Sequence, residues 1–157
     1  MDWTFQGEVF NPTEADLDPK KVYSFVYLIT NTVTGRWYVG KKLFWFSGWK
    51  KVKGKRKRIK VQSDWRTYYG SNVALAADVK SLGEDKFTRE ILTLCASKSE
   101  ASYLEAKQQI LRDAILTKDS YNDWICVRTT RRHLAKHAAR ICGLSSTPGP
   151  EKQELSS

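Results

Sequence analysis

Two tyrosines, a glutamate and an asparagine are the side chains whose types and order suggest chemistry. Tyr27 and Tyr38 lie on two neighbouring predicted strands, Glu105 lies in a long predicted helix, and Asn122 follows that helix. A phenol can help to deprotonate water when positive charge nearby lowers its pKa from about 10. A carboxylate oxygen suits a hard divalent cation. Each residue also has an ordinary explanation as a packing tyrosine, a surface acid or a turn asparagine, so the combination carries the argument.

The positive charge of the chain is concentrated in one segment. The formal net charge of the 157 residues is +10, and residues 41–66 hold eleven basic residues and one acid. The rest of the chain is neutral, so this segment predicts a local anion-binding surface, for which nucleic acid is the commonest large partner. Trp37, Trp45, Trp49 and Trp65 lie in or beside it. Such aromatic side chains stack on bases or belong to the core of a hairpin.

Several protein classes are excluded by the sequence. Hydrophobic residues make up 41% of the chain, which predicts a packed core, and no apolar run approaches the length of a membrane span. The N-terminus lacks a secretory pattern, so we expect an intracellular, cytoplasmic protein without a membrane partner. Cys95, Cys126 and Cys142 lack the spacing of a disulfide scaffold or zinc site. His133 and His137 are four residues apart, but basic neighbours favour a solvated face over a metal site.

The element pattern predicts an α+β fold. Residues 22–30 and 37–42 read as the two strands of a hairpin, and residues 86–95 as a third strand. Residues 73–82 form a predicted helix that ends at Gly83, and a capping box of Ser97 and Glu100 opens a longer helix to about Leu116. We therefore expect a small three-stranded antiparallel sheet flanked by helices, with a basic hairpin or loop inserted at residues 43–64.

The ordered motifs resemble those of the GIY-YIG nuclease superfamily, in particular its phage-borne and homing-type members. The triplets FVY and YVG, which end at Tyr27 and Gly40, correspond to the GIY and YIG motifs that name the superfamily. The resemblance continues through Tyr69-Gly70-Ser71 to Glu105 and Asn122, and it spans roughly residues 22–124. It implies a metal-dependent endonuclease that hydrolyses DNA by in-line attack of water and leaves 5′-phosphate and 3′-hydroxyl ends.

The resemblance also implies roles for individual residues. Tyr27 would lie at the attacking water and Tyr38 near the scissile phosphate, while Glu105 would hold one Mg²⁺ or Mn²⁺ ion that polarises the phosphate. Asn122 would support the site, and Lys41 and Lys42 follow the second triplet closely enough to supply positive charge near Tyr27.

The arginine that family members place after the second triplet is displaced here by the basic insertion. Arg66 is the best candidate for this cation, and Tyr69 lies near the position of a histidine or tyrosine in many members. Lys42 is the second candidate, although a point charge replaces a bidentate guanidinium poorly.

These patterns divide the chain into an N-terminal arm (1–21), a nuclease-like domain (22–127), a basic helix (128–143) and a disordered tail (144–157). The expected partner is DNA, duplex or branched, with RNA left open, bound by a monomer or by a transient dimer. Because lysine-rich contacts position rather than specify, we expect the insertion to hold the phosphate backbone and to read little sequence. The alternatives are an inactive nucleic-acid-binding module and a basic structural protein. The residues predicted to bind nucleic acid are Lys50, Lys51, Lys53, Lys55, Arg56, Lys57, Arg58 and Lys60.

Overall fold

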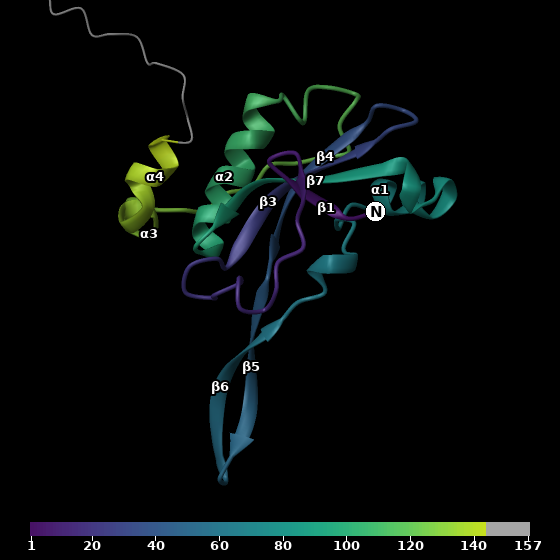
Figure 1. The fold of residues 1–157 in the computed structure, drawn as a ribbon. Coiled ribbons are helices and arrows are strands. Elements are labelled where there is room, and N and C mark those ends of the chain that lie inside the picture. Colours follow the sequence, from purple (N-terminus) through teal and green to yellow (C-terminus); the bar gives the residue numbers. More distant parts are fainter. Residues whose placement is uncertain (144–157) are drawn as a thin grey trace, which may run out of the picture.

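A computed structural model of the protein describes residues 1–143, and the predicted disordered tail at 144–157 lies outside them. A five-stranded sheet forms the centre of the fold (Figure 1), with strand order β2-β1-β7-β3-β4. The strands are β1 (Trp3–Phe5), β2 (Glu8–Val9), β3 (Ser24–Asn31), β4 (Trp37–Leu43) and β7 (Phe87–Cys95). The α+β class and the three central strands agree with the sequence analysis.

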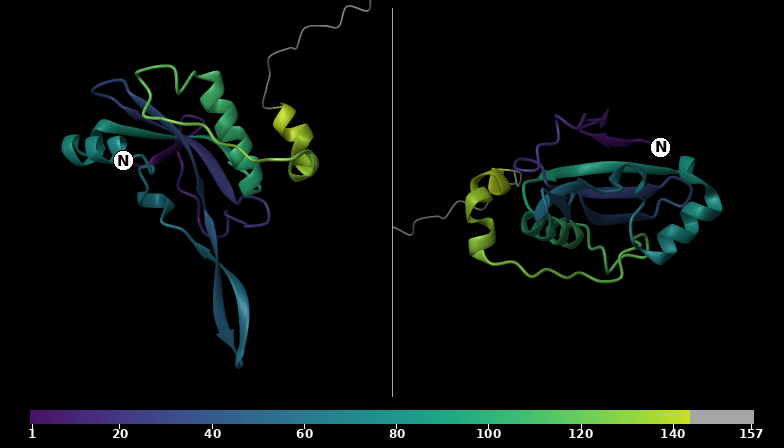
Figure 2. Two further views of the ribbon diagram at one scale, coloured as in Figure 1. Left: turned by 180° about the vertical axis from the view of Figure 1, so that it is seen from behind. Right: turned by 90° about the horizontal axis from the view of Figure 1, so that it is seen from below.

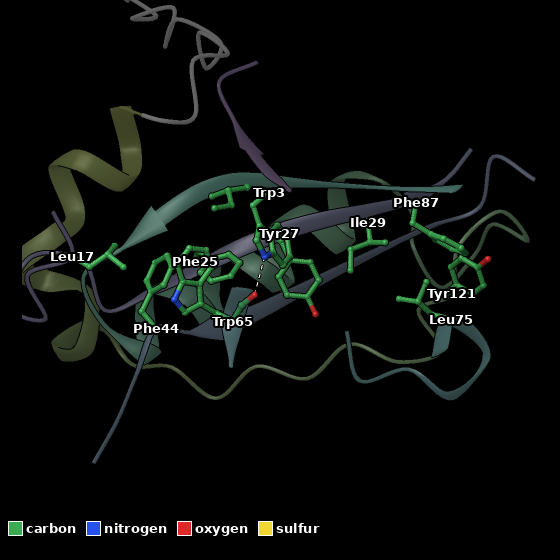
Figure 3. Packing of buried hydrophobic residues seen from close by; sticks show 11 residues of the cluster. Trp3, Leu17, Phe25, Tyr27, Ile29, Phe44, Trp65, Leu75, Phe87 and Tyr121 are labelled. Carbon is green, nitrogen blue, oxygen red and sulfur yellow. Dashed lines mark hydrogen bonds between the residues drawn. The ribbon is translucent and has the colours of Figure 1, made fainter. Parts of the chain in front are cut away.

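The predicted number of strands was too low, because the N-terminal arm is not irregular. β1 pairs in parallel with β7, and β2 pairs with β1, so the sheet is mixed and has five strands. Trp3 anchors the arm: its side chain is 2% exposed and its indole packs edge-on against Phe25 and Tyr27, 5.2 and 5.4 Å away. Its Nε1 donates a hydrogen bond to the carbonyl of Trp65 at 2.8 Å (Figure 3). A three-residue strand held by one distant side chain leaves little local pattern in the sequence.

The two faces of the sheet carry separate cores. Phe25, Tyr27 and Ile29 of β3 belong to one cluster together with Phe44 and Trp65 (Figure 3). Val26 and Val39 belong to the other cluster, which packs against Ala101 and Leu104 of α2 (Lys98–Leu111). Figure 2 shows α2 against this second face. The alternation along β3 therefore assigns Tyr27 and Val26 to opposite faces.

The helices begin where the sequence predicts. α1 spans Val73–Leu82, as predicted: the side chain of Asn72 accepts a hydrogen bond from the amide of Leu75 at 3.0 Å, and Gly83 ends the helix at a φ of 93°. Ser97 caps α2 in the same way. α2 ends at Leu111 rather than Leu116, and Asp113, two residues beyond, has a φ of 51° that no helix can continue.

The basic insertion is an ordered hairpin. β5 (Trp45–Val52) and β6 (Lys55–Gln62) pair along their whole length and form a separate two-stranded sheet. Lys53 and Gly54 form the turn, both with positive φ, as a two-residue hairpin turn requires. The hairpin projects away from the central sheet (Figures 1 and 2).

The remaining elements are short. A 3-10 turn, η1 (Trp65–Thr67), follows the hairpin, and η2 (Glu84–Lys86) precedes β7. The single basic helix predicted at the C-terminus is instead three pieces, α3 (Arg131–Leu134), η3 (Ala135–His137) and α4 (Ala138–Gly143). Arg140 pairs with the buried carboxylate of Glu100 and attaches this segment to α2. Among residues 1–143, no helix has the length and apolar character needed to cross a membrane.

Candidate active site

A pocket of about 680 Å³ opens at the outer edge of β4. Its walls come from β3, β4, the N-terminal end of α1, one face of α2 and the chain that follows α2. Four of the residues singled out from the sequence line it together: Tyr27, Tyr38, Glu105 and Asn122. The full lining is Tyr27, Tyr38, Lys41, Ser71, Asn72, Val73, Ala74, Ala77, Glu105, Gln109, Asn122, Asp123, Trp124 and Cys126.

Gly40 provides the space that Tyr27 occupies. Tyr27 and Gly40 are directly opposite on β3 and β4, and a Cβ atom at Gly40 would lie 2.4 Å from the Tyr27 hydroxyl oxygen. It would also lie 2.8 Å from the Cε1 atom of Tyr38. No side chain fits there without moving the tyrosine rings. The glycine of the second triplet thus allows the tyrosine of the first to lie over the strand.

Both pocket tyrosines are neutral phenols at physiological pH. Burial raises the pKa of Tyr27 well above 10, and the neighbouring phenols of Tyr68 and Tyr38 act in the same direction. Burial also raises the pKa of Tyr38, whose hydroxyl lies 3.5 Å from that of Ser71. The expected lowering of the Tyr27 pKa by Lys41 or Lys42 is absent, because both ammonium groups face carboxylates instead. Tyr27 is therefore suited to orient a water molecule through hydrogen bonds.

Lys41 and Glu105 form an ion pair in the pocket, whose lining also includes Asp123. The Nζ atom of Lys41 donates to Oε2 of Glu105 across the gap between β4 and α2. The Glu105 side chain is 13% exposed, and burial raises the pKa of its carboxyl above the usual 4.5, against the opposing effect of the Lys41 ammonium. Within residues 1–143, Lys41 is the one basic residue that lines the pocket.

Asn122 and Gln109 hold the edge of β4. Asn122 accepts a hydrogen bond from the Val39 amide at 2.9 Å and donates one to the Val39 carbonyl at 2.8 Å. Gln109 donates to the same carbonyl at 3.1 Å. Val39 lies between Tyr38 and Gly40, so these side chains fix the backbone from which the site is built. Its amide and carbonyl would otherwise be unpaired at the edge of the sheet.

Three predicted catalytic residues lie outside the pocket lining. Lys42 pairs with Asp64 at 2.6 Å, and its ammonium lies 3.7 Å from the centre of the Tyr68 ring. Arg66 donates hydrogen bonds to Asn11 and to the carbonyl of Pro12 in the N-terminal arm.

Tyr69, the third of them, accepts a hydrogen bond from the N-terminal amine and stacks on the guanidinium of Arg89. The structure does not bring Lys42, Arg66 or Tyr69 together with the four pocket residues.

Sequence reasoning missed part of the pocket wall. Gln109 follows Glu105 by four residues, so helical spacing would have placed it on the same face. Asn72 caps α1, and its side-chain amide also donates to the carbonyl of Tyr121 at 2.7 Å and so joins two walls of the pocket. Trp124 is 71% exposed at the pocket, and no pattern in the sequence indicated it.

The donor chemistry of the pocket fits a hard divalent cation. Glu105 supplies one carboxylate, and Mg²⁺ typically binds through one or two carboxylates together with water and substrate phosphate oxygens. Within residues 1–143 no group of three or more His, Cys, Asp or Glu side chains is arranged to hold a metal ion. A self-contained protein cage is thus lacking in the described part, whereas a site completed by substrate fits Glu105.

The eight basic residues predicted to bind nucleic acid all lie on the hairpin or its turn, and all are exposed to solvent. The residues 45–62 contain no acidic side chain. The hairpin therefore presents an unneutralised positive charge beside the pocket, since Trp45 follows Lys41 by only four residues.

Comparison with known proteins gives one result. The family model described as "Putative endonuclease segE, GIY-YIG domain" matches residues 3–125. No curated protein and no solved structure matches the chain. The matched range begins at β1, includes the whole central sheet and the basic hairpin, and ends just after the last strand-edge contact of Asn122.

Proposed function

Because the chain belongs to the GIY-YIG endonuclease family, we propose that it is a metal-dependent endonuclease that hydrolyses DNA phosphodiesters in the pocket at the edge of β4. The observation that carries this proposal is the convergence of Tyr27, Tyr38, Lys41 and Glu105 on one cavity. They come from two consecutive strands, β3 and β4, and from α2, whose Glu105 is 64 positions from Lys41 in the sequence. Together they offer two phenols, one ammonium and one carboxylate, the groups that hydrolysis of a phosphate diester uses.

In this proposal Tyr27 orients the attacking water. Its raised pKa keeps the phenol protonated, so it acts through hydrogen bonds rather than as a resident phenolate. The water oxygen forms the new bond to phosphorus, its proton passes to solvent, and the bond from phosphorus to the 3′ oxygen breaks. The 3′ oxygen takes a proton and leaves as a hydroxyl, while the phosphate remains on the 5′ side.

Lys41 and Glu105 separate when substrate binds. The Lys41 ammonium turns to a phosphate oxygen and stabilises the charge that grows on it, which is the role expected for the displaced arginine. Glu105 is the residue that would hold a Mg²⁺ or Mn²⁺ ion, which would supply Lewis-acid polarisation of the scissile phosphate. Tyr38 donates a hydrogen bond to the same phosphate group, and Asn122 keeps β4 in place.

Plasmid cleavage tests the proposal. Supercoiled DNA is incubated at low salt with Mg²⁺ or with EDTA, using the wild type and Glu105→Gln, which keeps the size of the side chain. We expect nicked or linear DNA only with the wild type and Mg²⁺, and unchanged gel-shift binding by the variant. Binding by both proteins with cleavage by neither, on plasmid, branched DNA and RNA, would support the inactive binding module instead.

A further inference from the structure

The register of the basic hairpin sorts its side chains into two different faces. Directly opposite residues of an antiparallel pair point to the same side, and neighbours along a strand alternate. In the outer half of the hairpin one face therefore carries Trp49, Lys51, Arg56 and Arg58, and we call it the arginine face. The opposite face carries Lys50, Val52, Lys55 and Lys57, and we call it the lysine face. Each face has three basic residues.

Side-chain contacts agree with this assignment. The Arg56 guanidinium lies 5.4 Å from the centre of the Trp49 ring, and Arg58 donates to the Ser47 hydroxyl at 3.0 Å. Ser47 lies two residues before Trp49, on the same face. Trp49 is 61% exposed, so its ring is held by a neighbouring guanidinium but not buried in a core. The arginine face is thus an ordered, solvent-facing surface of two guanidinium groups around an indole.

The base of the hairpin is fixed to the domain. The amide of Ser63 donates to the Phe44 carbonyl at 2.8 Å, and Lys60 donates to the Tyr23 hydroxyl at 3.2 Å. Lys42 and Asp64, which lie just before and just after the hairpin in the sequence, form an ion pair at its base. Because its base is fixed in this way, the hairpin can hold a ligand at a set distance from the pocket.

The lysine-rich composition predicts contacts to the phosphate backbone alone, but the register gathers both arginines on one face. We propose that this hairpin enters the major groove of duplex DNA on one side of the cut, with the arginine face toward the base edges. This inference rests on the proposed function for the position of the cut. A two-stranded ribbon fits the major groove, and arginine is the side chain that pairs bidentately with guanine there. The lysine face turns away from the bases, and its long side chains reach the flanking phosphates as point charges.

The length of the basic hairpin limits how much DNA it can contact. Eight residues per strand span about 26 Å at roughly 3.3 Å per residue. Eleven residue steps of roughly 3.3 Å separate Lys41 in the pocket from Val52 beside the tip, which gives at most about 36 Å, or about ten base pairs at roughly 3.4 Å each. The contacts should therefore extend about ten base pairs to one side of the cleaved bond, with no matching extension on the other side.

The two faces allow a charge-matched test. Arg56→Gln/Arg58→Gln and Lys55→Gln/Lys57→Gln each remove two positive charges from β6, on opposite faces. Binding of the full chain to 40-base-pair duplexes in EDTA, including a randomised pool, is measured together with protection of guanine N7 from methylation. EDTA prevents metal-dependent cleavage, so the assay does not depend on catalysis.

We expect N7 protection and sequence preference in the wild type, and loss of both in the arginine-face variant with about tenfold weaker binding to preferred duplexes. The lysine-face variant should bind all duplexes more weakly by a similar factor and keep the preference. Arg56→Lys/Arg58→Lys, which retains the charge, should also lose the preference.

Equal effects of the two double variants, or a wild type without N7 protection, would overturn the inference. Equal binding of the single strand and the duplex would do the same and would indicate stacking on Trp49 instead. Circular dichroism of each variant checks the fold. A specific footprint without cleavage under any condition would contradict the proposed function but support this inference. Cleavage that the hairpin variants leave unaffected would support the proposed function and contradict this inference.

Discussion

Tyr27 and Gly40 show at the scale of single residues how the two triplets depend on each other. The sequence places them on facing strands, and the structure shows that the Tyr27 ring lies close against Gly40. Which lysine faces the pocket could not be read from the sequence, because Lys41 and Lys42 are adjacent and alternate in direction. Only the register of β3 and β4, with α2 on one face, assigns Lys41 to Glu105.

The raised pKa of Glu105 predicts a pH-dependent metal affinity. Burial raises this pKa above 4.5, so the carboxylate proposed to hold the ion starts to protonate at a higher pH than in an ordinary glutamate. As the pH falls below the folded-state pKa, apparent Mn²⁺ affinity should drop by about tenfold per pH unit. Titration calorimetry of the protein bound to a short, uncleavable phosphorothioate duplex measures it.

Glu105→Gln is the control, and it should show weak binding without this pH dependence. The same shift has a consequence for stability: the contribution of Glu105 is fully present below its unfolded pKa and is lost as the pH rises through its folded pKa. An Mn²⁺ affinity that stays constant down to pH 4.5 would contradict the account.

β4 is the element on which the site depends, and it lies at the edge of the sheet. Its outer edge is covered by the chain that follows α2: Tyr121 donates to the Trp37 carbonyl at 2.8 Å, and Asn122 pairs with Val39. The boundaries of α1 could be predicted because both of its caps are local. The pairing of the chain after α2 with the edge of β4 could not be predicted, since it joins residues more than eighty positions apart.

Asn122→Ala should therefore destabilise the fold. It leaves the buried Val39 amide without its partner and removes one donor to the Val39 carbonyl, at a cost of about 2–3 kcal/mol. Urea denaturation measures the free energy of unfolding. Asn11→Ala, which alters an exposed asparagine in the arm, serves as the control and should cost less than about 1 kcal/mol. Equal stability of the two variants would show that the edge contact contributes nothing.

At the scale of the whole molecule, the N-terminal segment belongs to the core of the GIY-YIG domain rather than forming a separate arm. β1 extends the sheet beyond β7. Trp3 packs against Phe25 and Tyr27, on the face of the sheet that carries Tyr27. The family match also begins at Trp3. Strands are predicted from the alternation of apolar and polar residues, and the three residues of β1 are too few to show it. The longer central strands could therefore be predicted, and β1 could not.

Trp3→Ala should cost about 3–5 kcal/mol of unfolding free energy, because it removes a buried indole from between two aromatic rings. Val9→Ala in the neighbouring strand β2, where the side chain is 65% exposed, should change the stability by less than about 0.5 kcal/mol. Chemical denaturation of both variants makes the comparison. A small effect at Trp3 would mean that its packing against Phe25 and Tyr27 contributes little to the stability of the domain.

Adjacent lysines offer the most direct test of where the chemistry occurs. Lys41→Met and Lys42→Met each remove one positive charge from β4, but only Lys41 lines the pocket. Single-turnover cleavage of a defined duplex with saturating protein and Mg²⁺ measures the chemical step for each. We expect a loss of about 100-fold or more for Lys41→Met, as for other groups that stabilise the transition state, and less than about tenfold for Lys42→Met. The reverse order would place the reaction outside the pocket at the edge of β4 and contradict the account.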